Sequence, residues 1–484
     1  MDARTPGLVR EQAFIGGDWV DADSGATFAV SDPASGAVVG HAPDMGAAET
    51  RRAIAAAEAA LPVWRGMLAK DRARIMRRWF DLVLSEQERL ARIICAEMGK
   101  PMGESRGEIA YGAAFIDWFA EEGRRVYGDV LPASGADRRM LVMKQPIGVT
   151  AAITPWNFPS AMFARKVGAA LGAGCAMVVK PSELSPFSAL ALAELAAEAG
   201  VPAGLVNVVT GHDPAPIGLE LTHNPIVRKL TFTGSTDIGR LLLRQAAENI
   251  QKCSMELGGN APMIVFEDAD LDAAVKAAAA TKYRNCGQTC VSANRFLVQA
   301  GIAEAFGRKL AETAAGLKVG PGAEDGVVVG PLVEEAAAQK VERHVADALA
   351  RGATLLTGGA RHPLGGTFYQ PTVLGNVPTD ALIFREETFG PVAPVIPFRT
   401  EEEAIRLANA TPFGLAAYFF SRDLPKIFRV AEQLEFGMIG VNETLISSEV
   451  APFGGVKHSG LGREGSRYGI DDYLEVKYVC LGGM

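Results

Sequence analysis

The sequence lacks the features that mark secreted, membrane-spanning and nucleic-acid-binding proteins. Its first residues contain no apolar core of a secretory signal, and no run of about 18 or more apolar residues occurs. It has 56 acidic against 48 basic residues, and a net charge of −8 argues against a nucleic-acid or anionic-membrane partner. These absences predict a cytoplasmic protein that binds neither nucleic acid nor membranes.

Cysteine and histidine are also scarce, with six of each in 484 residues. The histidines are scattered singly and no C-x-x-C pair occurs, whereas zinc needs two ligand pairs at short spacing, so no metal site is expected. In the cytoplasm the cysteines should remain thiols. Cys286 and Cys290 lie four positions apart. They could be a redox pair, half of a metal site, or one working thiol beside a bystander.

The chain is too long for one ordinary core, so two or three domains are expected. Alanine-rich amphipathic segments cover 47–60, 68–98 and 104–127. Further along, "VGAALGAGCAMVVKPSE" indicates a helix, a glycine turn and a buried strand, and this order recurs. The alternation predicts an α/β architecture.

Two outlying segments, 138–145 and the C-terminal "DYLEVKYVCLGG", have strand character. In the second, apolar and charged residues alternate with the period of two that is typical of a strand. Such a terminal strand either completes a sheet in another subunit or forms an edge of its own domain.

The segment "LTFTGSTDIGR" predicts a strand, a Gly-Ser-Thr turn at Gly234 and Ser235, and a helix that begins near Asp237. Backbone N–H groups at a helix start form a phosphate site, although a purely structural turn is also consistent with this motif. In "VVKPSE", Lys180 and Glu183 directly follow a buried strand, where they could bind ribose hydroxyls. A carboxylate at this place repels a 2′-phosphate, which favours NAD over NADP.

Cys290 follows "GQT" in a glycine-containing loop, where a thiolate could face a cleft. Glu256 in "MELGGN" precedes two glycines, and as a carboxylate shielded from water it would suit general-base work. Asn157 in "TPWNFP" could stabilise an oxyanion together with the Cys290 backbone N–H. A lone cysteine is otherwise a small buried hydrophobe and a lone glutamate a solvated surface group.

These segments together resemble the aldehyde dehydrogenase superfamily, most closely its succinate-semialdehyde dehydrogenases. The resemblance extends from about residue 10 to the end of the chain, and its motifs occur in the family's order. They are "TPWNFP", "KPSE", "FTGST", "MELGGN", "GQTC", "EETFGP" and "PFGGVKHSGLGREG".

The resemblance implies a Rossmann-type cofactor domain, an α/β catalytic domain and a small β oligomerisation domain. The cofactor domain would comprise 1–127 and 146–254, and the catalytic domain 255–435. Residues 128–145 and 466–484 would be the oligomerisation segments of a homodimer or homotetramer. Residues 436–465 would return to the cofactor domain and the active-site rim.

The resemblance also implies the roles of site residues. Cys290 would be the nucleophile, Glu256 the base and Asn157 the oxyanion donor. The dinucleotide, NAD in preference or NADP, would contact Thr154, Pro155, Trp156, Lys180, Ser182, Glu183, Gly234, Ser235, Leu257, Glu387 and Phe389. Cys290 would attack an aldehyde, hydride would pass to the nicotinamide, and water activated by Glu256 would hydrolyse the resulting thioester.

In the semialdehyde branch, the distal carboxylate of the substrate is bound by residues that match Arg165, Arg284 and Ser447 here. A guanidinium pairs with a carboxylate through two parallel hydrogen bonds, although a single arginine is more often a surface residue. The expected substrate is succinic semialdehyde. Glutarate or 2-oxoglutarate semialdehyde, or a broad range of aldehydes, are alternatives with the same mechanism.

Some semialdehyde dehydrogenases have a redox-active second cysteine two places after the nucleophile, where this chain has Ser292. That redox pair is therefore missing, and a disulfide between Cys286 and Cys290 within one helical turn would be strained. The favoured interpretation is that Cys286 is a packed bystander. A non-catalytic dinucleotide-binding protein and an acyl-CoA-forming enzyme are disfavoured, because Cys290, Glu256 and Asn157 are all present.

Overall fold

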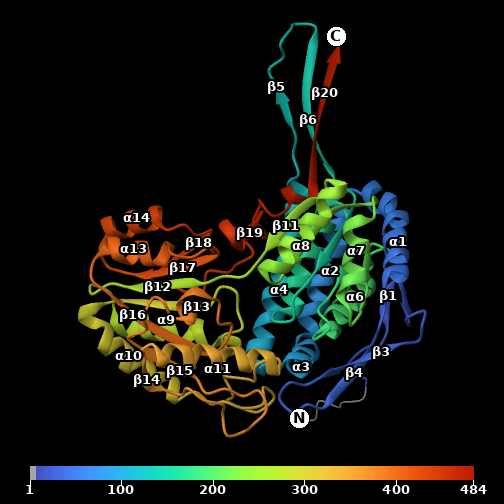
Figure 1. Cartoon of the computed structure of the whole chain (residues 1–484). Helices are drawn as coiled ribbons and strands as arrows, with labels where there is room; N and C mark the ends of the chain where they lie inside the picture. Colours follow the sequence, from blue (N-terminus) through green and yellow to red (C-terminus); the bar gives the residue numbers. More distant parts are fainter. Residues whose placement is uncertain (1–6, 484) are drawn as a thin grey trace.

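The computed structural model describes residues 7–483, and two large sheets with their covering helices form its two halves. Figure 1 shows these halves side by side, with a narrow three-stranded sheet that projects from one of them. No helix within 7–483 is long and apolar enough to cross a bilayer. The same residues contain no cluster of three or more His, Cys, Asp or Glu side chains that could hold a metal ion.

The first half contains an eight-stranded sheet in the order β19-β11-β10-β7-β8-β9-β1-β2. Its five central strands, β11 to β9 in that order, are parallel, and the outer strands are antiparallel. The strands are β1 (Ala13–Ile15), β2 (Asp18–Val20), β7 (Val149–Ile153), β8 (Ala176–Lys180), β9 (Val206–Val208), β10 (Val227–Thr233), β11 (Lys252–Glu256) and β19 (Gly460–Leu461).

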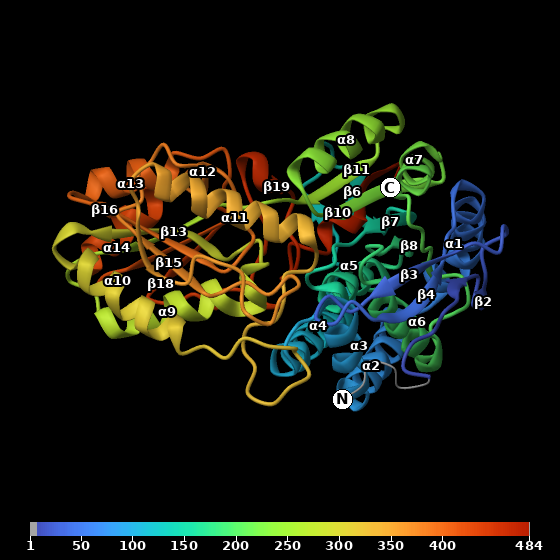
Figure 2. The ribbon, with the colours of Figure 1, turned by 60° about the horizontal axis from the view of Figure 1, so that its bottom comes forward.

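Helices cover both faces of this sheet, with α1, α7 and α8 on one face and α5 and α6 on the other (Figure 2). Helices α2, α3 and α4 form an outer layer over α5 and α6. The helices are α1 (Ala47–Gly66), α2 (Ala69–Ser85), α3 (Gln87–Met98), α4 (Met102–Glu122), α5 (Pro159–Ala173), α6 (Pro186–Ala199), α7 (Pro214–His223) and α8 (Thr236–Ala246).

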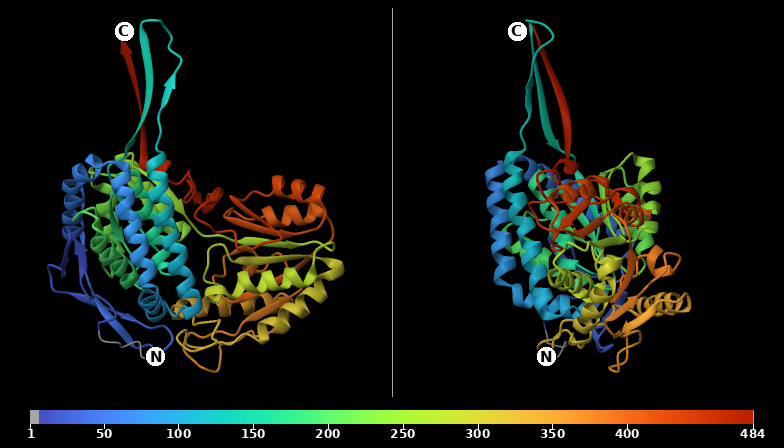
Figure 3. Two further views of the ribbon diagram at one scale, coloured as in Figure 1. Left: turned by 180° about the vertical axis from the view of Figure 1, so that it is seen from behind. Right: turned by 90° about the vertical axis from the view of Figure 1, so that its left-hand side faces the viewer.

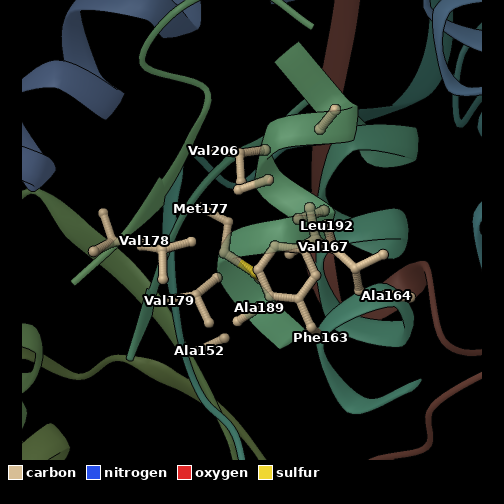
Figure 4. Close-up of a cluster of buried hydrophobic side chains, with 14 of the residues drawn as sticks. Ala152, Phe163, Ala164, Val167, Met177, Val178, Val179, Ala189, Leu192 and Val206 are labelled. Atoms are coloured by element: carbon tan, nitrogen blue, oxygen red, sulfur yellow. The ribbon is translucent and has the colours of Figure 1, made fainter. Parts of the chain in front are cut away.

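The core of this half lies between β8 and helices α5 and α6. Met177 and Val179 of β8 point toward Phe163 of α5 and Leu192 of α6, and all four side chains are fully or almost fully buried (Figure 4). Burying side chains of this size contributes about 1.5–3 kcal/mol each to folding. The strand must therefore be apolar on both faces, which is why "AMVV" shows no alternation.

The second half contains a seven-stranded sheet in the order β14-β15-β16-β13-β12-β17-β18, parallel except for β14. Helices α9 and α10 pack together on one side of it, and α13 and α14 on the other. The strands are β12 (Ala261–Val265), β13 (Ala293–Gln299), β14 (Thr354–Thr357), β15 (Thr372–Gly375), β16 (Val392–Phe398), β17 (Ala416–Phe420) and β18 (Met438–Val441). The helices are α9 (Leu271–Tyr283), α10 (Ala300–Ala315), α11 (Glu335–Ala350), α12 (Leu382–Arg385), α13 (Glu401–Asn409) and α14 (Leu424–Gln433).

The two outlying segments pair with each other in a three-stranded antiparallel sheet of β5 (Asp129–Leu131), β6 (Arg138–Pro146) and β20 (Leu474–Gly482). The predicted C-terminal strand is thus present, and Figure 3 shows how far the sheet extends from the body. The remaining strands, β3 (Thr27–Ser31) and β4 (Val38–Pro43), form a two-stranded ribbon. Val476 and Tyr478 on β20 are 68% and 53% exposed, so residues 7–483 do not cover these two side chains of its apolar face.

The chain crosses from the first sheet to the second between β11 and β12, through "LGGN". It returns late, because β18 still lies in the seven-stranded sheet and β19 pairs with β11. The second sheet therefore extends past residue 435, the expected end of the catalytic domain. The domain limits expected from the sequence stay a prediction.

The two connections bring opposite sheet edges together. Strands β7, β8, β10 and β11 are parallel, so the segments that follow them lie at one carboxyl edge of the first sheet. Strands β12 and β16 begin directly after "LGGN" and "EETFGP", and β13 begins two residues after "GQTC", all at the amino edge of the second sheet. The sequence motifs therefore meet where the two edges face each other.

Candidate active site

A cavity of about 740 Å³ lies between the two sheet edges. It is lined by most of the side chains that the sequence predicted for the site: Asn157, Glu256, Cys290, Pro155, Trp156, Gly234, Ser235, Leu257, Glu387, Phe389, Arg165, Arg284 and Ser447. Four predicted cofactor residues, Thr154, Lys180, Ser182 and Glu183, do not line it; they follow β7 and β8 at the same carboxyl edge.

Cys290 lies in the loop between the short 3-10 segment Arg284–Gly287 and β13, and it is partly exposed. The loop packs so closely on "LGGN" that a Cβ atom on Gly259 would lie 2.5 Å from the Cys290 carbonyl oxygen. Burial, with Glu387 and Glu256 nearby, raises the pKa of the Cys290 thiol to about 12, against the lowering effect of two arginines. The sulfur is therefore a thiol at neutral pH until a base removes its proton.

Glu256 ends β11 and is 3% exposed. Neither of its carboxylate oxygens has a hydrogen-bond partner among residues 7–483, although both are buried. Burial and the negative charge of Glu464 raise the pKa of Glu256 well above its ordinary value. A desolvated carboxylate without partners is free to accept a proton, which is the property that a general base requires.

Asn157 follows β7 and is 7% exposed. Its Nδ2 donates a hydrogen bond to the carbonyl oxygen of Gln288, at 3.0 Å. One amide N–H is thereby fixed against the loop that carries Cys290. The second N–H of the same amide group can donate to an oxygen atom held beside the sulfur.

Cys286 is 1% exposed and belongs to the hydrophobic core of the second half. Helix α9 ends at Tyr283, and Asn285 and Cys286 have φ values of 51° and 55°, in the left-handed region. The two cysteines therefore do not share a helical turn, and both are free thiols. Burial also raises the pKa of the Cys286 thiol, so this geometry favours the bystander interpretation.

The residues around helix α8 fit a dinucleotide phosphate. Ser235 is the N-cap residue of α8, since its Oγ accepts a hydrogen bond from the Ile238 N–H at 3.4 Å. Gly234 and Ser235 line the cavity, and the buried Oγ1 of Thr233 beside them has no hydrogen-bond partner in the described part of the chain. The start of a helix of eleven residues offers N–H groups and a positive dipole end to an anion.

Two further groups suit the ribose and nicotinamide parts of the cofactor. Lys180 Nζ lies 2.9 Å from a carboxylate oxygen of Glu183 at the end of β8. Across the cavity, at the edge of the second sheet, Glu387 accepts a hydrogen bond from the Gly259 N–H at 3.0 Å. Burial raises the pKa of Glu387 to about 7. Phe389 has a strained φ of 54° and packs edge-on against Trp156, with ring centroids 5.7 Å apart.

The end of the cavity near Arg284 contains two arginines beside the carboxyl groups of Glu104 and Glu108. Arg284 makes no salt bridge within the part of the chain that the structure describes, and its guanidinium lies 5.6 Å from the centroid of the Phe158 ring. Arg165 is 1% exposed and bonds Glu464 at 3.3 Å and the hydroxyl of Tyr111. Ser447 lies in the same cavity. Arg284 is thus the guanidinium most available to a substrate carboxylate.

Sequence reasoning missed Tyr111, Glu464 and Lys166. Glu464 bonds Arg165 and Lys166, yet lies about 300 positions from both, so no local pattern could pair them. Tyr111 could have been found. The cavity-lining residues Glu104, Gly107, Glu108 and Tyr111 fall at the i, i+3, i+4, i+7 spacing of one helical face, within a segment already predicted to be helical.

Comparisons with known proteins agree with this arrangement. A profile of the aldehyde dehydrogenase family matches residues 19–479. The chain is 60% identical to a glutarate-semialdehyde dehydrogenase of Pseudomonas aeruginosa, with all of both chains covered. It is 58% identical to GabD of Escherichia coli, a succinate-semialdehyde dehydrogenase named for NADP(+), again over both full lengths.

Among solved structures, a succinate-semialdehyde dehydrogenase from Burkholderia pseudomallei is 61% identical. It superimposes with a TM-score of 0.98, over 99% of this chain and 100% of the other. The chain therefore belongs to the aldehyde dehydrogenase family of NAD(P)-dependent oxidoreductases. The predicted fold class and the predicted family are both confirmed.

Proposed function

We propose that the protein oxidises succinic semialdehyde to succinate with NAD(P), through a thiohemiacetal and a thioester on Cys290. One observation carries the proposal: a single cavity holds the Cys290 thiol and the unpartnered Glu256 carboxylate near the guanidinium of Arg284. The first two groups suit aldehyde oxidation, and the third suits a substrate with a distal carboxylate. Several relatives at 55–60% identity bear semialdehyde dehydrogenase names, which supports the same substrate class, although a 57% identical relative of Pseudomonas putida is named a 3-sulfolactaldehyde dehydrogenase.

The residues of the chain divide the reaction between them. Glu256 or solvent takes the proton of Cys290, whose sulfur then bonds to the aldehyde carbon while Asn157 and a backbone N–H bind the oxyanion. A nicotinamide held near Glu387 and Phe389 would accept the hydride that leaves the carbon atom when the oxyanion re-forms a carbonyl group, and this loss of hydride leaves a thioester on Cys290. Glu256 then takes a proton from water, the resulting hydroxide attacks the thioester carbon, and the carbon–sulfur bond breaks to release the acid.

Arg284→Ala is expected to raise KM for succinic semialdehyde by about 10- to 100-fold, the value of one or two charge-assisted hydrogen bonds. An uncharged aldehyde of similar length, such as butanal, should show at most about a twofold change, because it has no carboxylate to bind. Steady-state kinetics on both substrates provides the measurement. Arg165→Ala tests carboxylate binding less clearly, because it would also remove a partner of the buried Glu464 carboxylate.

Equal losses on the two aldehydes would show that Arg284 does not bind the substrate carboxylate.

The same assay separates the rival substrates, because glutarate semialdehyde is one methylene longer than succinic semialdehyde. If kcat/KM is higher for glutarate semialdehyde than for succinic semialdehyde, the chain has the activity named for its Pseudomonas aeruginosa relative. One methylene changes discrimination by about 10- to 200-fold, so the comparison is decisive.

We further propose that NAD is preferred over NADP, although the E. coli relative is named for NADP(+). The support is Glu183, whose carboxylate follows β8 and is only partly neutralised by Lys180, so it should repel a 2′-phosphate. Glu183→Gln is then expected to raise kcat/KM for NADP about tenfold relative to NAD. Glu198→Gln, on the exposed side of α6, is the matched control and should leave the ratio unchanged. A wild-type enzyme that prefers NADP would contradict this assignment.

Assembly and compartment complete the proposal. The three-stranded sheet would contact a second copy of the chain in a homodimer or homotetramer, because Val476, Tyr478 and Leu481 of β20 are exposed. The six free cysteines are consistent with a cytoplasmic enzyme. The division into cofactor, catalytic and oligomerisation domains is proposed with the limits expected from the sequence.

A further inference from the structure

At the wall of the cavity lies a buried ion pair that the mechanism does not use. Lys100, between α3 and α4, pairs with Glu108 on α4, and the two residues are 1% and 3% exposed. Taking two charges out of water costs several kcal/mol per ion, which their attraction only partly offsets. Such a pair contributes little to the stability of the fold, so a role in the active site would better explain its presence.

Both members of the pair hold the segment that carries Asn157. Lys100 Nζ donates to the Asn157 carbonyl oxygen at 2.7 Å, and it lies 3.8 Å from the centroid of the Phe158 ring. Glu108 Oε1 accepts hydrogen bonds from the N–H groups of Ser160 and Ala161, at 3.0 and 3.1 Å. These two N–H groups belong to the first turn of α5, whose N-cap residue provides no side-chain cap.

The nucleophile loop is tied to the same point from the other half of the molecule. Asn285 Nδ2 donates to the Asn157 carbonyl oxygen and to the Gln288 carbonyl oxygen, both at 3.1 Å. Gln288 is fully buried, and its side chain bonds Pro331 and Val333 of the second half. The Asn157 carbonyl is therefore held from two sides, while the Asn157 amide is held by Gln288.

We propose that Lys100 and Glu108, with Asn285, are positioning residues that hold the Asn157 amide where the oxyanion forms beside Cys290. This inference rests on the proposed function, because it gives Asn157 the oxyanion role. A catalytic group needs to be held within about 0.5 Å of its productive position. Rigid buried contacts on both sides of Asn157 meet that need. The ion pair then serves the geometry of the transition state rather than the stability of the fold.

Two reactions of the Cys290 thiol separate this role from a purely structural one. With p-nitrophenyl acetate, a sulfur–carbon bond forms, the carbonyl oxygen becomes an oxyanion, and the ester carbon–oxygen bond then breaks to release p-nitrophenolate. With iodoacetamide, a sulfur–carbon bond forms and iodide leaves, without an oxyanion. In both reactions the thiol proton passes to base or solvent. A folded variant whose thiol is displaced loses both reactions, whereas a displaced Asn157 loses only the first. An unfolded thiol is alkylated readily, because the burial that raises its pKa is gone, so the melting temperature of each variant is recorded to show that it is folded.

The variant to test is Lys100→Met combined with Glu108→Gln. It removes the donor to Asn157 without leaving a buried charge unpaired, and the glutamine oxygen can still accept from the first turn of α5. Lys100→Met alone is the simpler change, but it leaves the Glu108 carboxylate buried without its partner. The double variant is expected to lower the rate of acylation by p-nitrophenyl acetate about 10- to 100-fold, somewhat less than loss of an oxyanion donor. Alkylation by iodoacetamide should stay within about twofold of wild type.

Glu97→Gln is the matched control. Glu97 is a 1% exposed glutamate on α3, and its carboxylate accepts from the N–H groups of Phe187 and Ser188 at the start of α6, at 2.8 and 3.0 Å. It thus repeats the capping role of Glu108 without contact to Asn157. Its replacement should leave the ratio of acylation to alkylation unchanged.

The same double change is then made in an Asn157→Ala background, where it should lower acylation by no more than about twofold, because the group it positions is gone. Equal losses of acylation and alkylation, an unchanged acylation rate, or an effect that multiplies with that of Asn157→Ala would each overturn the positioning role. If Asn157→Ala itself acylates at the wild-type rate, the oxyanion assignment in the proposed function fails as well. These outcomes do not depend on aldehyde oxidation, so they distinguish the two proposals.

Discussion

Replacement of Cys290 by alanine is expected to abolish NAD(P)H formation from succinic semialdehyde, with kcat lowered about 10⁴-fold or more. The reason is chemical: without the sulfur no thiohemiacetal forms, and a hydrated aldehyde expels hydride far less readily. Losses on this scale follow removal of the nucleophile from acyl-transfer enzymes. The measurement is the absorbance of the reduced cofactor, with the melting temperature recorded to show that the variant is folded.

Cys286→Ala is the matched control for Cys290→Ala. It removes a thiol four positions away that packs in the core and lies off the cavity lining. We expect near wild-type kcat and a loss of stability of about 1 kcal/mol, the usual cost of a small core truncation. Substantial activity in Cys290→Ala, or an equal loss in Cys286→Ala, would show that sulfur 290 is not the nucleophile.

Glu256→Gln is expected to lower kcat by about 10²- to 10⁴-fold, the usual contribution of a positioned general base. Glutamine has nearly the same volume but accepts no proton from water, so the thioester should accumulate. The first turnover should therefore survive as a rapid burst of one reduced cofactor per active site, followed by a very slow steady state. Rapid-mixing absorbance measures both phases, and Glu312→Gln, on the exposed face of α10, should behave as wild type.

The pH dependence of the wild-type enzyme follows from the same residue. The carboxylate must be ionised to accept a proton, and burial and Glu464 raise the pKa of Glu256 well above its ordinary value. kcat should therefore be low in acid and rise with pH through that raised pKa. The rise should be missing in Glu256→Gln. If Glu256→Gln shows no burst but its kcat still rises with pH as in the wild type, the base is another group.

The sequence could predict the parts of the site that follow directly from strands. Asn157, Lys180, Gly234 and Glu256 each lie at or just after the end of a buried strand, and parallel pairing places all of them at one edge. Family motifs then predicted Cys290 and Glu387, which the structure places at the amino edge of the second sheet. Local pattern and resemblance were sufficient because these residues are positioned by the backbone that carries them.

The remaining parts depend on contacts between distant segments. Glu464 pairs with Arg165 and Lys166 only because "GREG" returns to the first half after the second sheet is complete. Because this contact occupies Arg165, Arg284 is the more available guanidinium. The sequence around each arginine could not show this difference. Likewise, Lys100 links the α3–α4 connection to the segment before α5, and Glu108 links α4 to α5. Helical spacing gives the face of α4 but not its neighbour.

The most direct test of the covalent mechanism is peptide mass spectrometry of Glu256→Gln, quenched in acid after mixing with succinic semialdehyde and NAD. We expect the succinyl group on the peptide that contains Cys290, and its release by hydroxylamine, as a thioester requires. An unmodified Cys290 peptide at the end of a complete burst, or the acyl group on another residue, would contradict the mechanism.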